Sequence, residues 1–155
     1  MSKSKSLLEQ SAPFNEFEDS VLNEFISEAR EQQFSAGKVL FHELSEGDEI
    51  YFIVSGETRI SVELASAYHM TEEIESGPGE LIGEGRFISD GPRPASVTAI
   101  SDVTALVWDV AAWKSIAGKN PVVGYRLAVF AGKVLFERVG KLRDQLINDI
   151  SWGLE

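Results

Sequence analysis

The chain contains no cysteine and only two histidines. Without cysteine it can form neither a disulfide framework nor a thiolate metal site, and it has no thiol nucleophile. His42 and His69 stand 27 residues apart, and neither has an obvious partner in the sequence. A metal-dependent enzyme on a barrel scaffold needs a cluster such as His-x-His, so ordinary barrel or loop positions are the simpler interpretation of both residues. The sequence therefore predicts no metal site and no cofactor.

Basic residues are also scarce. Lysine and arginine total 14 against 25 aspartate and glutamate residues, which gives a formal net charge of −11. A protein of that charge repels phosphate backbones, so we expect no direct nucleic-acid binding. No apolar run approaches the roughly 20 residues needed to cross a bilayer, and residues 1–10 contain too few apolar residues for a signal peptide. We therefore expect a cytoplasmic protein that does not associate with membranes.

The composition is that of one globular domain. Of 155 residues, 43% are apolar and 25% are charged, which is close to the average for soluble proteins. Residues 1–13 are polar and aperiodic, and we predict a disordered tail there. A helix is predicted over about residues 19–29, because apolar residues recur there at the spacing of one helical face, and Asp19 or Ser20 can cap it.

Between residues 31 and 110 the pattern is typical of short strands. In residues 57–64, polar side chains alternate with side chains suited to a core, which is typical of a half-buried strand. Residues 50–54 and 103–110 are continuous apolar runs, which are typical of strands covered on both faces. Turn signals such as Ser55-Gly56 recur at short intervals. We predict about eight antiparallel strands in a sandwich or barrel.

The pattern becomes helical again after the strands. A short helix is predicted over about residues 111–117, and Asn120-Pro121 begins a long helix, 121–150, that contains no further proline. The predicted fold class is α+β: an eight-stranded antiparallel β-roll, jelly-roll-like (a double-stranded β-helix), with one N-terminal and two C-terminal helices. The domain is expected to span residues 14–150, and residues 151–155 form a tail too short for a DNA-binding module.

One stretch, residues 81–97, carries groups suited to chemistry with an anion. Gly83 and Gly85 allow the backbone to approach an anion closely. Arg93 offers a planar fork that matches two phosphate oxygens, and Glu84 offers an acceptor for a sugar hydroxyl. These groups predict a nucleotide site on a loop between strands. The sequence contains no Gly-x-Ser-x-Gly elbow, P-loop or dinucleotide fingerprint, so we expect no enzyme and no catalytic residue.

This stretch resembles the phosphate-binding cassette of the cyclic nucleotide-binding domain family, which includes the catabolite activators and the regulatory subunits of cAMP-dependent kinase. Gly83-Glu84 and the segment Pro92-Arg93-Pro94-Ala95-Ser96-Val97 stand at the family's spacing, nine residues from Glu84 to Arg93. The segment from Gly47 to Glu57 is similar to the family's strand-turn-strand signature, and Asn120-Pro121 matches the start of its long helix. The resemblance covers about residues 20–150.

The resemblance implies a receptor for a cyclic nucleotide, cAMP or cGMP. Glu84 would accept a hydrogen bond from the ribose 2′-hydroxyl, and Arg93 would pair with the cyclic phosphate. Backbone amides of Gly83, Gly85 and Arg86, with the hydroxyl of Ser96 nearby, would complete the anion site. The implied ligand-binding residues are Gly83, Glu84, Gly85, Arg86, Arg93, Pro94, Ala95, Ser96 and Arg138.

Three positions depart from the family's pattern. Gly85-Arg86-Phe87 replaces a Leu-Ala-Leu-type triplet, so Arg86 either fills the phosphate position, adds a second positive charge to it, or points into solvent. Pro94 has no amide N–H to offer a phosphate. Arg138 and Val139 match the Thr-Ser pair that holds adenine in the transcription-factor branch, and Arg138 could stack on a purine instead.

Two functions remain open from the sequence. The chain is either a cyclic nucleotide receptor or a domain without a ligand, in which Glu84 and Arg93 form a buried ion pair, acting as a dimerisation or protein-interaction module. No output partner is predicted. In both cases we expect a homodimer through helix 121–150, unless its apolar stripe packs on its own barrel. The stripe repeats at heptad intervals and consists of Ala128, Gly132, Leu135, Val139, Leu142 and Leu146.

Overall fold

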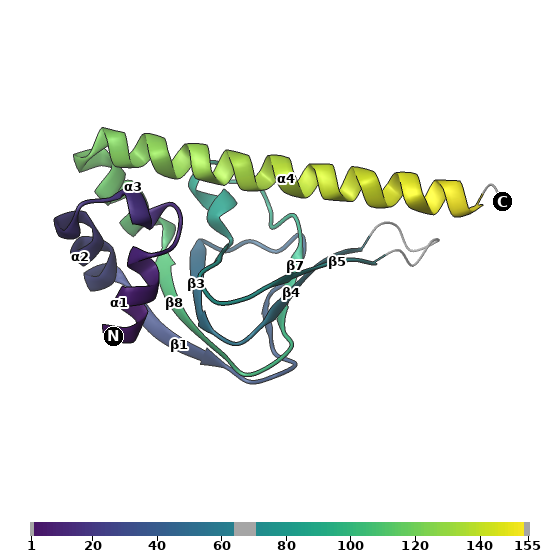
Figure 1. Cartoon of the computed structure of the whole chain (residues 1–155), viewed down its shortest axis with the longest axis horizontal. Coiled ribbons are helices and arrows are strands. Elements are labelled where there is room, and N and C mark those ends of the chain that lie inside the picture. Colours follow the sequence, from purple (N-terminus) through teal and green to yellow (C-terminus); the bar gives the residue numbers. More distant parts are fainter. Residues whose placement is uncertain (1, 64–70, 154–155) are drawn as a thin grey trace.

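The chain folds into a β-roll with helices packed against one end and along one side (Figure 1). The computed structural model describes residues 2–63 and 71–153. Its eight strands form two four-stranded antiparallel sheets, with strand orders β1-β8-β3-β6 and β2-β7-β4-β5. The predicted α+β fold class with an antiparallel β-roll is therefore confirmed.

The elements follow one another in the order helix, strands, helix. In chain order they are α1 (Ser2–Glu9), the 3₁₀ helix η1 (Phe14–Glu16), α2 (Asp19–Glu28), β1 (Arg30–Phe34), β2 (Val39–Phe41), β3 (Glu49–Ser55), β4 (Thr58–Glu63), β5 (Thr71–Ser76), β6 (Leu81–Ile82), the 3₁₀ helix η2 (Glu84–Phe87), β7 (Ser96–Ala99), β8 (Val103–Asp109), α3 (Val110–Lys119) and α4 (Pro121–Gly153).

The N-terminal segment differs from its prediction. A disordered tail over residues 1–13 is wrong for most of its length, because α1 occupies Ser2–Glu9 and Leu8 is fully buried. Leu8 packs into the same core as Phe14 of η1, and this apolar anchor holds an otherwise polar segment in place. The fold thus has two N-terminal α-helices instead of one. At the other end, α4 continues to Gly153, so residues 151–153 are helical, and residues 154–155 lie outside the described part.

Strands β3 and β8 are buried on both faces, as their continuous apolar runs predict. Successive side chains of a strand point to opposite faces, and in β3 they enter two different cores. Ile50 and Phe52 face the helices together with Trp108 of β8. Tyr51 and Ile53 face the interior of the roll. These two strands therefore form the wall that separates the helical core from the core of the roll.

An aromatic cluster joins the helices to the outer face of that wall. Phe14 lies 5.2 Å from Phe25 of α2 between ring centres, and Trp108 lies 5.7 Å from Trp113 of α3, both with edge-to-face geometry. The indole nitrogen of Trp108 donates a hydrogen bond of 2.7 Å to the carbonyl oxygen of Phe25. This cluster fixes α2 and α3 against the sheet, and α3 leads directly into α4.

The long helix α4 is covered only in its first half. Leu127 and Ala131 are buried against the rest of the chain, whereas Phe136 is 82% exposed and Val139 is 55% exposed. Figure 1 shows the second half extending beyond the roll. Within the described ranges, no helix combines the length and the apolar character needed to cross a membrane. In the single chain, much of the predicted heptad stripe is left without a covering surface.

Candidate functional site

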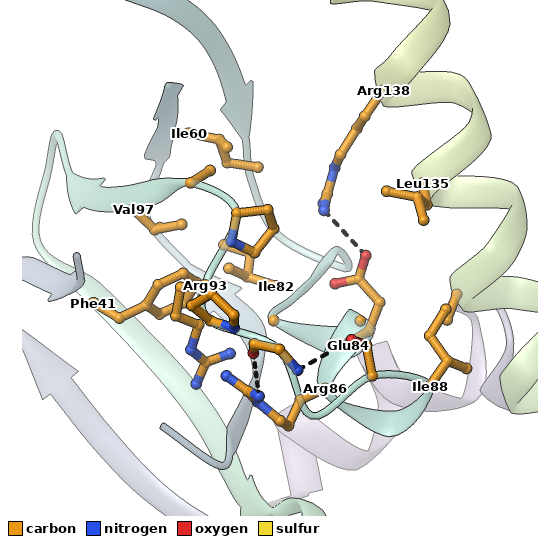
Figure 2. A pocket seen from close by; sticks show the side chains of 18 residues that line it. Phe41, Ile60, Ile82, Glu84, Arg86, Ile88, Arg93, Val97, Leu135 and Arg138 are labelled. Atoms are coloured by element: carbon orange, nitrogen blue, oxygen red, sulfur yellow. Dashed lines mark hydrogen bonds and ion pairs between the residues drawn. The ribbon is translucent and has the colours of Figure 1, made fainter. Parts of the chain in front are cut away.

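A cavity of about 250 Å³ lies between the β6–β7 loop, the roll and α4. Figure 2 shows charged side chains gathered around it, with Arg138 and Leu135 reaching in from α4. Apolar side chains from β2, β4 and α4 form much of its wall, for example Phe41, Ile60 and Leu135. Eight of the nine residues predicted for the site line it: Gly83, Glu84, Gly85, Arg86, Arg93, Pro94, Ala95 and Arg138.

Ser96 is the exception among the predicted site residues. It is not part of the cavity lining, and its hydroxyl oxygen instead accepts a hydrogen bond of 2.8 Å from the backbone amide of Glu43. The apolar wall, in contrast, was missed from the sequence. Phe41 and Ile60 lie on strands far from residues 81–97 in sequence, and only their apolar character could have suggested a buried position.

Gly83 is required by the geometry of the site. Its φ of +77° lies in the left-handed region, where a side chain is strained. A Cβ atom at this position would stand 2.8 Å from a guanidinium nitrogen of Arg93 and 3.0 Å from the carbonyl oxygen of Glu49. Gly85 is different, because a Cβ atom there would meet nothing within 4 Å. The first glycine lets Arg93 come close, and the second leaves open space beside the cavity.

Arg93 is a buried cation that contacts one backbone carbonyl and one aromatic ring. Its Nη2 donates a 2.8 Å hydrogen bond to the carbonyl oxygen of Glu49, and its guanidinium carbon lies 4.2 Å from the centre of the Phe41 ring. Within the described part of the chain, Arg93 has no carboxylate partner and its Nε has no hydrogen-bond partner. Burial, and after it the charge of the neighbouring Arg86, lowers the pKa of Arg93. Such a group favours the arrival of an anion.

Arg86 is also buried, so its interpretation as a surface arginine is wrong. Its Nη1 donates a 2.6 Å hydrogen bond to the carbonyl oxygen of Gly91, on the far side of its own loop. Figure 2 shows its guanidinium group beside that of Arg93, away from α4. The backbone amide of Arg86 donates to the carbonyl oxygen of Gly83 at 3.1 Å. That amide is therefore not free in this conformation, contrary to the prediction that it serves the anion site.

The carboxylate of Glu84 pairs with Arg138, and not with Arg93 as in the ligand-free alternative. Its Oε1 lies 3.2 Å from Nη1 of Arg138, which reaches in from α4. The Glu84 side chain is only 3% exposed, and its Oε2 has no hydrogen-bond partner among the described residues. Burial raises the pKa of Glu84, and Arg138 opposes this effect without cancelling it. Arg138, for which the sequence suggested stacking on a purine, pairs with the carboxylate of Glu84.

The raised pKa of Glu84 makes stability depend on pH. A carboxyl group with a higher pKa in the folded state binds its proton more tightly there, so its contribution to the free energy of unfolding falls as pH rises from the ordinary value of 4.5 through the folded pKa. We expect Glu84→Gln to remove this decline, because the amide carries no charge to bury. The variant should be more stable than wild type at neutral pH, and the two should converge at acidic pH.

Urea denaturation at a series of pH values measures this difference. Glu137→Gln on the exposed face of α4 is the matched control, and its stability should differ little from wild type at any pH. A wild-type protein that is more stable than Glu84→Gln at neutral pH would contradict the prediction.

The histidines do not form a metal site in the described part of the chain. No group of three or more histidine, aspartate or glutamate residues there could hold a metal ion. His42 is exposed on the loop after β2, and His69 lies outside the described residues.

Comparisons with known proteins agree with the geometry of the site. The family model of the cyclic nucleotide-binding domain matches residues 31–120, which include the whole β6–β7 loop but not Arg138. The CRP-like cAMP-activated global transcriptional regulator of Mycobacterium tuberculosis is 26% identical over 144 residues, which are 93% of this chain. The chain spans 64% of the length of that regulator.

Solved structures show the same fold. The regulatory domain of Toxoplasma gondii PKA, crystallised with cAMP, superposes with a TM-score of 0.68 and 26% identity, over 74% of this chain and 43% of that one. The catabolite activator protein of Thermus thermophilus gives a TM-score of 0.73 and 25% identity, over 86% of this chain and 62% of that one. The resemblance found in residues 81–97 is thereby confirmed.

Proposed function

The chain belongs to the cyclic nucleotide-binding domain family, and we propose that it is a receptor for one cyclic purine mononucleotide, cAMP or cGMP. The observation that carries the proposal is the pair of unsatisfied buried groups in one cavity: the cation of Arg93, which has no carboxylate partner in the described chain, and Oε2 of Glu84. A nucleotide offers a phosphate to the first and a ribose hydroxyl to the second. The cavity of about 250 Å³ lies near the lower end of the volumes of small-molecule sites, which begin at about 300 Å³.

The proposed binding mode follows from the positions of these groups. The cyclic phosphate would accept hydrogen bonds from the guanidinium group of Arg93, with the open space beside Gly85 next to it. The ribose 2′-hydroxyl would donate to Glu84, and the purine would lie towards Leu135 and Arg138 on α4. Hydrogen bonds to charged groups in buried positions contribute about 1.5–3 kcal/mol each, so Arg93 and Glu84 would supply most of the polar binding energy.

Titration calorimetry with cAMP and with cGMP tests the proposal. Wild-type protein should bind at least one of them, and Arg93→Leu should weaken that binding by about 1.5–3 kcal/mol, or roughly 10- to 150-fold, because a phosphate then enters without its charged donor. Arg126→Leu, which removes an exposed arginine from α4, should bind as wild type does. Absence of heat with either nucleotide at millimolar concentration would refute the receptor function.

The alternative function is a ligand-free dimerisation or protein-interaction module. The contact between Glu84 and Arg138 favours it, because the carboxylate that would bind ribose already has a partner on α4. The same titration separates the two functions, since this module would bind neither nucleotide.

We also propose a homodimer formed through α4. Its support is the apolar character of the uncovered second half of the helix, where Phe136, Val139, Leu146 and Ile150 are all about half exposed or more. These side chains follow one another at intervals of three, seven and four residues, which places them on one side of the helix, where a second helix could pack. The expectations of a cytoplasmic location and of no direct nucleic-acid binding rest on composition and on the net charge of −11.

A further inference from the structure

Two buried guanidinium groups lie side by side at one end of the cavity. The groups of Arg86 and Arg93 are neighbours in Figure 2, on the side away from α4. The two residues are 7% and 3% exposed. Each donates to a backbone carbonyl, Arg86 to Gly91 and Arg93 to Glu49, and each keeps an Nε without a hydrogen-bond partner in the described chain. This end of the cavity therefore contains two cations and unused donors.

The charges around the cavity do not cancel. Among the described lining residues, four carry charge: Glu84, Arg86, Arg93 and Arg138. Arg138 and Glu84 pair with each other, which leaves Arg86 and Arg93 without a counter-charge from the lining. The nearby carboxylate of Glu49 is engaged elsewhere, because it pairs with Arg30 and accepts a hydrogen bond from the hydroxyl of Tyr51. The carboxylates of Asp48 and Glu49 act on Arg93 from outside the lining, but the lining itself carries an excess of positive charge at Arg86 and Arg93.

Two like charges that are close and buried repel each other strongly, and an anion that neutralises both gains more than one that neutralises only one. A cyclic phosphate is a diester and carries a single negative charge. An open phosphate monoester carries about −1.5 to −2 at neutral pH and has three acceptor oxygens. The charge of this site therefore matches a monoester better than a diester.

Building on the proposed function, we infer that nucleoside 5′-monophosphates are ligands of the same cavity and that Arg86 is a second phosphate ligand, one that selects for the doubly charged group.

The local backbone supports a role for the Arg86 side chain. Phosphate sites often use backbone amides, but here the amide of Arg86 is engaged with Gly83 and Pro94 has none. Side-chain donors would then supply a larger share of the hydrogen bonds to the phosphate. Arg86 can do so while keeping its bond to Gly91, because that bond uses Nη1 and leaves Nε available. A Cβ atom at Gly85, which lines the cavity, would meet nothing within 4 Å, so the cavity is not closed at that residue.

Calorimetric titration of three proteins with 5′-AMP, 5′-GMP, cAMP and cGMP tests the inference. The proteins are wild type, Arg86→Gln and the control Arg126→Gln, whose exposed arginine lies on α4. Wild type and the control should bind a 5′-monophosphate at least as tightly as the cyclic form of the same base. Arg86→Gln should weaken monophosphate binding by about tenfold or more, the effect of losing one bond to a charged group, and cyclic nucleotide binding by less than about threefold.

A fourth protein, Arg86→Lys, distinguishes charge from support of the loop. It keeps the positive charge but loses the planar fork that reaches Gly91. If charge selects the ligand, Arg86→Lys keeps the preference for monophosphates that Arg86→Gln loses. If Arg86 only supports the loop, both variants weaken all four ligands alike, and the inference is overturned. If Arg86→Gln does not fold, the four titrations of wild type still test whether the cavity binds a 5′-monophosphate at least as tightly as the cyclic nucleotide.

The two proposals fail in different ways. Binding of a cyclic nucleotide without binding of a monophosphate would overturn the inference and leave the receptor function intact. Binding of a monophosphate that depends on Arg86, without binding of a cyclic nucleotide, would support the inference and refute the proposed ligand. Absence of binding for all four nucleotides would overturn both.

Discussion

Val139→Glu on α4 is expected to convert a dimer into a monomer. Val139 belongs to the predicted heptad stripe and is exposed in the single chain, so a glutamate there leaves the fold of one chain intact. In a dimer built on this stripe, each copy would bury one unpaired carboxylate close to the other. Such burial costs several kcal/mol per ion, and a loss of about 3 kcal/mol already weakens association by more than 100-fold.

Sedimentation or light scattering over a range of protein concentrations measures this change. Gln145→Glu is the matched control, because it adds the same charge at an exposed position outside the predicted heptad stripe. The control should dimerise as wild type does. A wild-type protein that is already monomeric at micromolar concentration, or equal effects of the two substitutions, would remove the α4 stripe as the dimer interface.

Trp108→Ala should produce the largest loss of stability. Trp108 is fully buried between β8 and the helices, and its indole nitrogen donates to the carbonyl oxygen of Phe25. Truncation of a buried tryptophan removes its packing and leaves a cavity, which lowers the free energy of unfolding by about 3–5 kcal/mol. The helices α2 and α3 lose the residue that both contact through Phe25 and Trp113.

Urea denaturation at one fixed protein concentration measures this loss, because a dimer makes apparent stability depend on concentration. Trp108→Phe separates the effect of lost side-chain volume on stability from the effect of the lost hydrogen bond. It keeps an aromatic ring but loses the bond to Phe25, so it should be less damaging than the alanine. A loss below about 1 kcal/mol for Trp108→Ala would contradict the assignment of Trp108 to the centre of the core.

The strands were predictable because their patterns are local. The apolar run at residues 50–54 implied a strand covered on both faces, and β3 confirms it with side chains in two cores. The helix α1 was not predictable in the same way. Its sequence is polar apart from Leu7 and Leu8, and it is held by Leu8 packing in the core with Phe14. A contact of this kind depends on the folded core and leaves no periodic signal in the segment itself.

In the candidate site, too, local sequence patterns were predictable and contacts that depend on the fold were not. The spacing of Glu84 and Arg93 was enough to identify the loop, and counting from Asn120-Pro121 pointed to Arg138, which lines the cavity. The partners of these residues were not evident from the sequence. Glu84 pairs with Arg138 and not with Arg93, because the position of α4 over the loop is decided by packing of the whole helix. For the same reason the buried position of Arg86 became visible only in the fold.

If the chain binds a nucleotide as proposed, the contact between Glu84 and Arg138 would couple the long helix to that binding. The helix α4 is continuous from Pro121 to Gly153, so a movement of the whole helix would also move Arg138. A protein that binds the outer half of α4 and presses it towards the roll would keep Arg138 at Glu84 and oppose a ribose there, whereas one that draws the helix away would free the carboxylate. The total free energy of binding does not depend on which ligand binds first. The nucleotide would therefore change the affinity of this chain for that protein by the same factor by which the protein changes its affinity for the nucleotide. The nucleotide and the bound protein would then each regulate the binding of the other through Glu84 and Arg138.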